Sequence, residues 1–142
     1  MTIAKVIEGR NQEIFSCQAS AMVEEAARIL SERRIGALPV FKDGAIAGIF
    51  SERDLLHGVA RDGAAALCKR VGDVMTAPAI TVHPDTGVLE ALSLMTRRRI
   101  RHLPVERGGK TVGFVSIGDL VKYRIELIES EAEQMREYIQ MA

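Results

Sequence analysis

The sequence repeats itself over most of its length. The stretch GIFSERDL at residues 48–55 returns as GFVSIGDL at residues 113–120, an offset of 65 positions. The same offset places LPV at 38–40 over LPV at 103–105 without a gap. A register that is kept along the whole chain indicates a duplication, so the sequence predicts two copies of one structural unit.

Each copy of the first motif ends a short apolar strand at a serine and begins a helix that carries an aspartate three residues later. The pairs are Ser51 with Asp54 and Ser116 with Asp119. This spacing is close to a capping box, and capping alone would account for either copy. A helix start also holds backbone N–H groups that have no partner within the helix, which suits an anion. We therefore expect a hydroxyl, several free N–H groups and a carboxylate at each helix start.

The same elements are expected in both copies. They are short helices at 3–7 and 71–75, strands at 14–17 and 80–83, helices capped by Ser20 and Asp85, strands at 37–41 and 102–106, and returning strands at 45–50 and 111–115. Apolar residues at i, i+3, i+4 and i+7 give each long helix one buried face. Pro39 and Pro104 lack an N–H, so we expect them at a sheet edge or a strand start.

The expected fold class is α/β, or α+β in local order, with two tandem β-α-β-β-α repeats related by a pseudo-twofold axis. Residues 1–67 are assigned to the first repeat with its linker, 68–127 to the second, and 128–142 to an extended C-terminal helix. The Ala- and Gly-rich segment 58–69 is the expected tail of one helix and the link to the next repeat. Together these parts form one module.

An apolar seam continues along the C-terminal helix. Its members are spaced alternately by four and three residues: Val121, Ile125, Ile128, Ala132, Met135 and Ile139. The helix is otherwise rich in Glu, Lys, Arg and Gln, so this seam needs a partner. The partner is either the body of the protein or the same helix of a second subunit, although nearly three heptads are short for a coiled coil. We expect a homodimer.

Composition excludes several classes of function. The chain has 142 residues, 47% of them apolar and 27% charged, as in soluble globular proteins. Its formal net charge is zero, so no overall field attracts nucleic acid or an acidic membrane. It has neither a long apolar run nor the layout of a signal peptide at its start. We expect a cytoplasmic protein that binds neither nucleic acid nor a membrane.

Catalytic and metal-binding patterns are not found either. Cys17 and Cys68 lack CxxC spacing and are expected to be reduced thiols. His57, His83 and His102 are scattered, without the spacing of metal ligands. No nucleophile stands beside a base, and no glycine-rich stretch has the Walker signature. We therefore expect no catalytic residue, no metal site and no enzymatic activity.

The paired motifs resemble those of tandem CBS domains, the domain first noted in cystathionine β-synthase. They are RIGALPV at 34–40 with GIFSERDL, and RIRHLPV at 99–105 with GFVSIGDL. The resemblance covers nearly the whole chain and is to a stand-alone CBS pair. It implies a regulatory module for energy sensing that binds AMP, ADP, ATP, NAD or a related adenosyl ligand between the repeats, needs no cofactor, and signals to a protein partner. The alternative is a structural dimerisation or adaptor protein with empty clefts.

The resemblance also implies roles for individual residues. Asp54 and Asp119 would accept hydrogen bonds from ribose hydroxyls, and Ser51 and Ser116 would contact phosphate. The remaining positions would line the slot for the base: Ser16, Ile35, Ala37 and Pro39, or Thr81, Ile100, His102 and Pro104. When the two copies are aligned, Arg53 corresponds to Gly118 and Arg101 corresponds to Gly36. We expect these two arginines to gather phosphate and the two clefts to differ in affinity.

Overall fold

The computed structural model describes residues 1–8 and 13–141. A short helix α1 (Ile3–Ile7) precedes two repeats of similar order, with the following bounds. The first holds β1 (Cys17–Gln18), α2 (Val23–Arg33), β2 (Ala37–Lys42), β3 (Ala45–Ser51), α3 (Glu52–Asp62) and the 3-10 helix η1 (Gly63–Cys68); the second holds α4 (Val71–Val74), α5 (Val88–Arg98), β4 (His102–Arg107), β5 (Lys110–Ser116) and α6 (Ile117–Met141). Parts of the expected segments 1–67 and 128–142, namely 9–12 and 142, lie outside the described residues.

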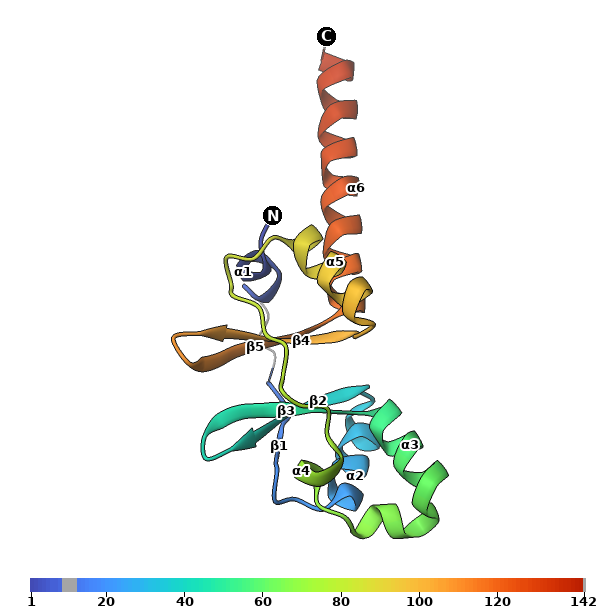
Figure 1. Cartoon of the computed structure of the whole chain (residues 1–142). Helices are drawn as coiled ribbons and strands as arrows, with labels where there is room; N and C mark the ends of the chain where they lie inside the picture. The colour runs from blue at the N-terminus through green and yellow to red at the C-terminus, as the bar shows by residue number, and fades with distance from the viewer. Residues whose placement is uncertain (9–12, 142) are drawn as a thin grey trace.

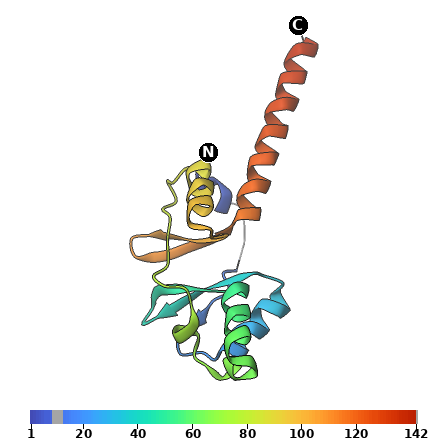
Figure 2. The same ribbon diagram turned by 45° about the vertical axis from the view of Figure 1, so that its right-hand side comes forward.

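The two sheets lie next to each other in the middle of the molecule, and the helices cover their outer sides (Figures 1 and 2). β2 and β3 are antiparallel, as are β4 and β5, and both hairpins carry a register shift at matched places, Val40/Phe41 and Val105/Glu106. The segment between α4 and α5 runs past both sheets (Figure 1). The predicted tandem αβ repeats with a C-terminal helix are confirmed.

The first strand of each repeat is shorter than expected. In the first repeat β1 covers Cys17–Gln18 and pairs in parallel with β2. In the second, only an isolated bridge joins Val82 to Val105, so the strand expected at 80–83 is wrong. Pro78 and Pro84 flank this segment and have no N–H to donate to a ladder.

The buried stripes of α2 and α5 are confirmed, but their expected N-caps are wrong. The caps are Met22 and Gly87, which make no side-chain capping bond, instead of Ser20 and Asp85. Backbone carbonyls from distant residues accept from the first helical N–H groups: Val23 donates to Lys69 O at 2.9 Å and Val88 to Met1 O at 3.3 Å. A tertiary contact has therefore replaced local capping.

The prolines differ in their positions. Pro39 is the third residue of β2, the middle strand of the order β1-β2-β3, so the expected edge position is wrong for it. β1 pairs with β2 only at Val40 and Phe41, so the first residues of β2, Pro39 included, have no partner in β1 on that side. A proline is tolerated there because no N–H is needed for pairing. Pro104 lies in β4 of a two-stranded sheet, as expected of an edge strand.

Each opening helix packs against the repeat to which it does not belong in sequence. Val6 of α1 joins the core of the second repeat with Val88 and Leu120, whereas Val71 of α4 joins the core of the first with Val23. Backbone bonds from Ile3 N to Thr86 O (2.9 Å) and from Val71 N to Ala21 O (2.8 Å) support the two contacts. The exchange ties the two repeats together.

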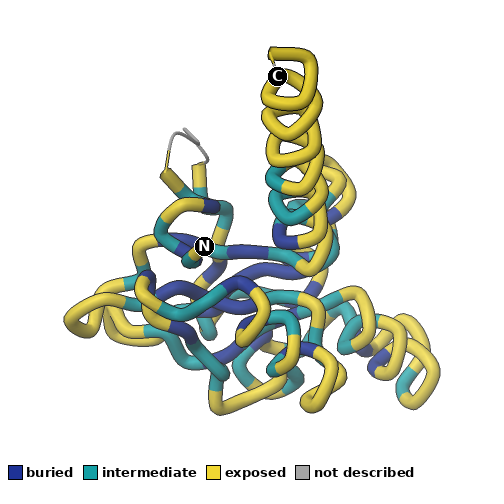
Figure 3. Tube along the Cα trace, turned by 90° about the horizontal axis from the view of Figure 1, so that it is seen from above, coloured by how far each residue is buried: buried dark blue, intermediate teal, exposed yellow. Residues whose placement is uncertain are grey.

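Helix α6 leaves the body after its first turns and projects into solvent (Figures 1 and 3). Leu120 is fully buried and Tyr123 is half-buried against the second core. All six seam residues, from Val121 to Ile139, are exposed. The body of the protein therefore does not cover the seam, which removes the first of the two partners considered for it.

Candidate functional site

The start of α3 carries a capping box, as its spacing predicted. Asp54 N donates to Ser51 Oγ at 3.4 Å, and Ser51 N donates to Asp54 Oδ2 at 2.9 Å. The second copy repeats this arrangement, with Asp119 N to Ser116 Oγ at 3.1 Å and Ser116 N to Asp119 Oδ2 at 2.8 Å. The duplicated motif thus builds two helix starts of the same geometry.

The expectation of several free N–H groups at these helix starts is wrong. Besides the capping bonds, Glu52 N donates to Gly36 O at 3.0 Å, and Ile117 N donates to Arg101 O at 2.8 Å. These carbonyls belong to the loop that follows the long helix of each repeat, which lies across the helix start. An anion near α3 must therefore be bound mainly by side chains.

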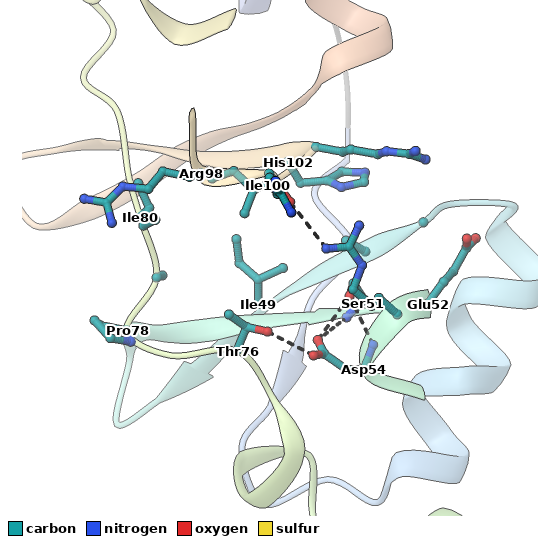
Figure 4. Close-up of a pocket in the computed structure, with 16 residues that line it drawn as sticks. Ile49, Ser51, Glu52, Asp54, Thr76, Pro78, Ile80, Arg98, Ile100 and His102 are labelled. Atoms are coloured by element: carbon teal, nitrogen blue, oxygen red, sulfur yellow. Dashed lines mark hydrogen bonds between the residues drawn. The ribbon is translucent and has the colours of Figure 1, made fainter. Parts of the chain in front are cut away.

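A cavity of ≈ 430 Å³ opens beside the start of α3, between the two repeats. This volume is within the range of small-molecule sites. Figure 4 shows Ser51, Asp54 and Thr76 on one side and Arg98, Ile100 and His102 on the other, with Ile49 between them. The lining is Gly36, Ala37, Ile49, Ser51, Glu52, Arg53 and Asp54 of the first repeat, Thr76, Pro78, Ala79 and Ile80 of the connecting segment, and Arg98, Arg99, Ile100, Arg101 and His102 of the second repeat.

Positive charge dominates one part of this lining. Its ionic side chains are four arginines and two acids: Arg53, Arg98, Arg99, Arg101, Glu52 and Asp54. Arg53 of the first repeat contacts the second, because its Nη1 donates to Arg99 O at 3.4 Å. Arg53 and Arg101, which belong to different repeats, therefore line the same cavity.

His102 lies at the contact between the repeats. Its ring stacks on Phe114 with a centroid distance of 5.5 Å, and a Cβ on Gly36 would lie 3.4 Å from its Cε1. Burial lowers the pKa of His102, and Arg101 lowers it further, while Asp119 and Glu52 act in the opposite direction. The imidazole is therefore held toward its neutral form.

Thr76 is a lining residue that the sequence analysis missed. Its hydroxyl donates to Asp54 Oδ1 at 2.9 Å, and its backbone exchanges two 2.9 Å hydrogen bonds with Ile49. The sequence feature that reflects this contact is Gly48, because a Cβ at that position would come within 2.6 Å of Thr76 O. A glycine in a strand often marks such a close approach of another backbone, but it does not say which one.

Seven of the fourteen expected site residues line this cavity: Ala37, Ser51, Arg53, Asp54, Ile100, Arg101 and His102. The other seven do not: Ser16, Ile35, Pro39, Thr81, Pro104, Ser116 and Asp119. Ser16 instead lines a separate hollow of ≈ 450 Å³ with Met22 and Arg70. The cavity thus combines the helix-start motif of one repeat with the post-helix loop of the other.

Within residues 1–8 and 13–141, no group of three or more His, Cys, Asp or Glu side chains is placed to hold a metal ion. Cys17 is buried and Cys68 is exposed, and both are free thiols. Over the same residues no helix, α6 included, is long and apolar enough to cross a bilayer.

Comparison with known proteins identifies the repeats. The profile of the CBS domain matches residues 10–61 and again residues 71–126, which is most of the chain. The chain belongs to the CBS-domain family. Its two repeats form a CBS pair, and the cavity lies between the two CBS domains.

Individual relatives agree with this assignment. The CBS domain-containing protein CBSX3, mitochondrial, of Arabidopsis thaliana is 40% identical over 129 residues, which are 87% of this chain and 63% of that protein. The chain thus spans less than two thirds of that relative. A CBS-domain containing protein of Agrobacterium tumefaciens has a solved structure that superposes with a TM-score of 0.82 at 35% identity, covering 87% of this chain and 92% of that one. The structure of CBSX2 in complex with AMP superposes with a TM-score of 0.74 at 26% identity, covering 89% and 97%.

Proposed function

We propose that this CBS pair is a regulatory module whose cavity binds an adenine nucleotide. The observation that carries this proposal is that one cavity between the repeats is lined by an aspartate and four arginines: Asp54, Arg53, Arg98, Arg99 and Arg101. A carboxylate suits a sugar diol, and clustered arginines suit phosphate. The AMP complex of the related CBSX2 supports the choice of ligand class.

The described contacts suggest how the ligand lies. Asp54 Oδ1 accepts from Thr76, while Oδ2 is used by the capping box, so a ribose would bind mainly at Oδ1. The N–H groups of the helix start are largely used, so the phosphates would bind the guanidinium groups of Arg53 and Arg101. The base would lie on the apolar part of the lining: Ala37, Ile49, Pro78, Ile80 and Ile100.

The proposal extends to ligand choice and signalling. AMP, ADP, ATP and NAD all carry the diol and phosphate that the lining fits, and the energy-sensing role rests on which of them binds. The module would act as a homodimer that passes a ligand-dependent change to a protein partner and would catalyse no reaction itself. The second cleft, with Ser116 and Asp119, would differ in affinity. The cytoplasmic location remains a prediction.

The test is a calorimetric titration of AMP, ADP, ATP, NAD and S-adenosylmethionine into wild type, Asp54→Ala and Asp119→Ala. Each variant removes the aspartate of one of the two equivalent capping boxes, so each is expected to lose about 1 kcal/mol of stability. Of these two aspartates only Asp54 lines the cavity. We therefore expect Asp54→Ala to abolish nucleotide binding in the cavity and Asp119→Ala to retain it. If none of these ligands binds the wild type, the nucleotide proposal fails and an adaptor with empty clefts is favoured.

A second set of variants examines the phosphate end. Arg53→Ala and Arg101→Ala are each expected to weaken AMP binding by about 10-fold or more, because each removes a charge-assisted hydrogen bond. Adenosine lacks phosphate, so its affinity should change little in either variant. Equal losses for AMP and adenosine would contradict the assignment of these arginines to phosphate.

A further inference from the structure

The outer part of α6 is an exposed helix with an apolar seam. Leu120 is buried against the body, whereas Val121 is 42%, Ile125 50%, Ile128 48%, Met135 60% and Ile139 65% exposed. Ala132, between Ile128 and Met135, is exposed as well. Within the described residues nothing packs on this face (Figure 3). A row of exposed apolar residues on a projecting helix indicates an interaction surface.

We propose that the α6 helices of two copies of this chain pair in parallel and in register as a short coiled coil. This deepens the homodimer part of the proposed function and does not depend on which ligand fills the cavity. The spacing of the seam assigns Ile125, Ala132 and Ile139 to heptad position a. Val121, Ile128 and Met135 then occupy position d. Both complete heptads of the seam, 125–131 and 132–138, thus have apolar residues at both core positions.

Charges beside the seam match the parallel arrangement. In a parallel coiled coil each g residue faces the e residue of the next heptad on the other helix. Arg124 at g would face Glu129 of the partner subunit, and Glu131 at g would face Arg136 of the partner subunit. Each of these contacts occurs twice in a symmetric dimer, and all of them are attractive.

The antiparallel arrangement with all apolar layers overlapped is disfavoured by the same charges. There, e residues face e residues and g residues face g residues. Lys122 would face Arg136 of the partner subunit, Glu129 would face Glu129 of the partner subunit, and Glu131 would face Glu131 of the partner subunit. Sliding the helices by one heptad restores attraction but leaves apolar layers without a partner. Like charges at these positions select against an alternative partner orientation.

The seam and the body-facing side of α6 point in different directions. The side of α6 that faces the body is marked by Leu120, Tyr123 and Leu127, which are buried or half-buried. The seam residue Val121 follows Leu120, and each residue turns the helix by about 100°. The seam therefore points sideways from the body. A twofold axis along the pair would then carry the two bodies to opposite sides of the coiled coil.

The first test measures mass in solution by sedimentation, with wild type, Ile128→Asp and Ser130→Asp as full chains. Both substitutions introduce the same charge on exposed positions of α6, one at d and the other on the opposite face. Wild type is expected to be a dimer of the 15.6 kDa chain. Ile128→Asp should raise the dissociation constant of the dimer by about 100-fold or more, because it buries two unpaired charges. Ser130→Asp should leave that constant within about 2-fold.

Two results would overturn the proposed surface. A monomeric wild type would mean that the seam serves a different partner, and it would also remove the homodimer from the proposed function. A dimer that Ile128→Asp does not weaken would mean that the copies join elsewhere. Nucleotide binding is measured separately by titration, so neither result depends on the ligand.

The second test decides orientation by oxidative crosslinking in a Cys68→Ser background. Ile125→Cys should form a disulfide with its own copy, since equivalent a residues face each other only when the helices are parallel and in register. In the antiparallel overlap, position 125 instead faces position 135. A disulfide that forms only when Ile125→Cys is mixed with Met135→Cys would overturn the parallel arrangement and leave the dimer intact.

Discussion

At the scale of single residues, His102 is where the two repeats touch. Its ring stacks on Phe114 and lies against the position of Gly36 in the other repeat. Burial and the neighbouring Arg101 both lower the pKa of this imidazole, whereas Asp119 and Glu52 raise it. The lowering prevails, so the folded protein favours the neutral ring at the contact between its halves.

This preference predicts how stability changes with pH. A histidine with a lowered pKa in the folded state binds its proton more readily when the chain is unfolded. Its contribution to the free energy of unfolding is therefore present above about pH 6.5 and is lost as the pH falls. Wild type should therefore lose more stability between pH 7 and pH 5.5 than His102→Gln, by up to about 1.4 kcal/mol for each unit of pKa difference. Urea denaturation of both proteins measures this; parallel pH profiles would contradict it.

Asp54 shows how much one side chain is used within the fold. Ser51 N and Ser51 Oγ both donate to its Oδ2, and Thr76 donates to its Oδ1. The same carboxylate therefore caps a helix, ties the connecting segment to the first repeat, and faces the cavity. In the proposed complex, a nucleotide bound to Asp54 would contact a residue that also holds the connecting segment against the first repeat.

At the scale of elements, the ends of α2 and α5 share an unusual backbone. Arg34 and Arg99 have φ values of 54° and 55°, in the left-handed region, and their N–H groups bond to the last helical carbonyls. Glycine is favoured at such a position because it has no Cβ. The strained residue in each repeat directs the chain into the loop whose carbonyl accepts from the next helix start.

Arg34 is the better position to measure this strain, because Arg99 lines the cavity. We expect Arg34→Gly to raise the free energy of unfolding by about 0.5–1 kcal/mol, since relief of the left-handed strain exceeds the added flexibility of the unfolded chain. The matched control is Glu32→Gly, inside the same helix and equally exposed, which should lower it by about 0.5–1 kcal/mol. Losses of similar size in both variants would mean that the Arg34 backbone carries no strain.

At the scale of the whole molecule, the exchange of α1 and α4 makes the two repeats depend on each other. Val6 and Val71 occupy matched positions in sequence, are 2% and 0% exposed, and pack in opposite cores. Neither repeat has a complete core without the opening helix of the other. The chain therefore passes twice between the repeats, once after α1 and once after α4, and these two connections hold the cavity between the repeats in place.

A pair of matched substitutions tests this exchange. Val6→Ala and Val71→Ala should each cost about 1–3 kcal/mol of stability, through lost burial and a residual cavity. Amide hydrogen exchange should speed up in α5, β4 and β5 for Val6→Ala, and in α2, β2 and β3 for Val71→Ala. The opposite distribution, with each substitution loosening its own repeat in sequence, would contradict the exchanged packing.

Much of the fold follows from local patterns in the sequence. The periodic stripes of α2 and α5, the two hairpins and the Ser51–Asp54 spacing each depend on residues that are close together in the chain, and the 65-residue offset is found by comparing two such stretches. The physical preferences involved, such as capping and the period of a helix or strand, act over a few residues. These features are therefore visible without a structure, and the family resemblance rests on them.

Contacts between distant segments had to come from the tertiary structure. Periodicity shows that Val6 and Val71 are buried but not in which core, and it cannot show that Lys69 and Met1 carbonyls replace the expected N-caps. In the same way, Arg53 and Arg101 were recognisable as cations, but only the packing of one repeat against the other placed them in one cavity. Which residues can bind, cap or be buried is therefore visible in the sequence, because those are local properties. Which of these residues meet is visible only in the folded chain, because that depends on the free energy of packing the whole chain.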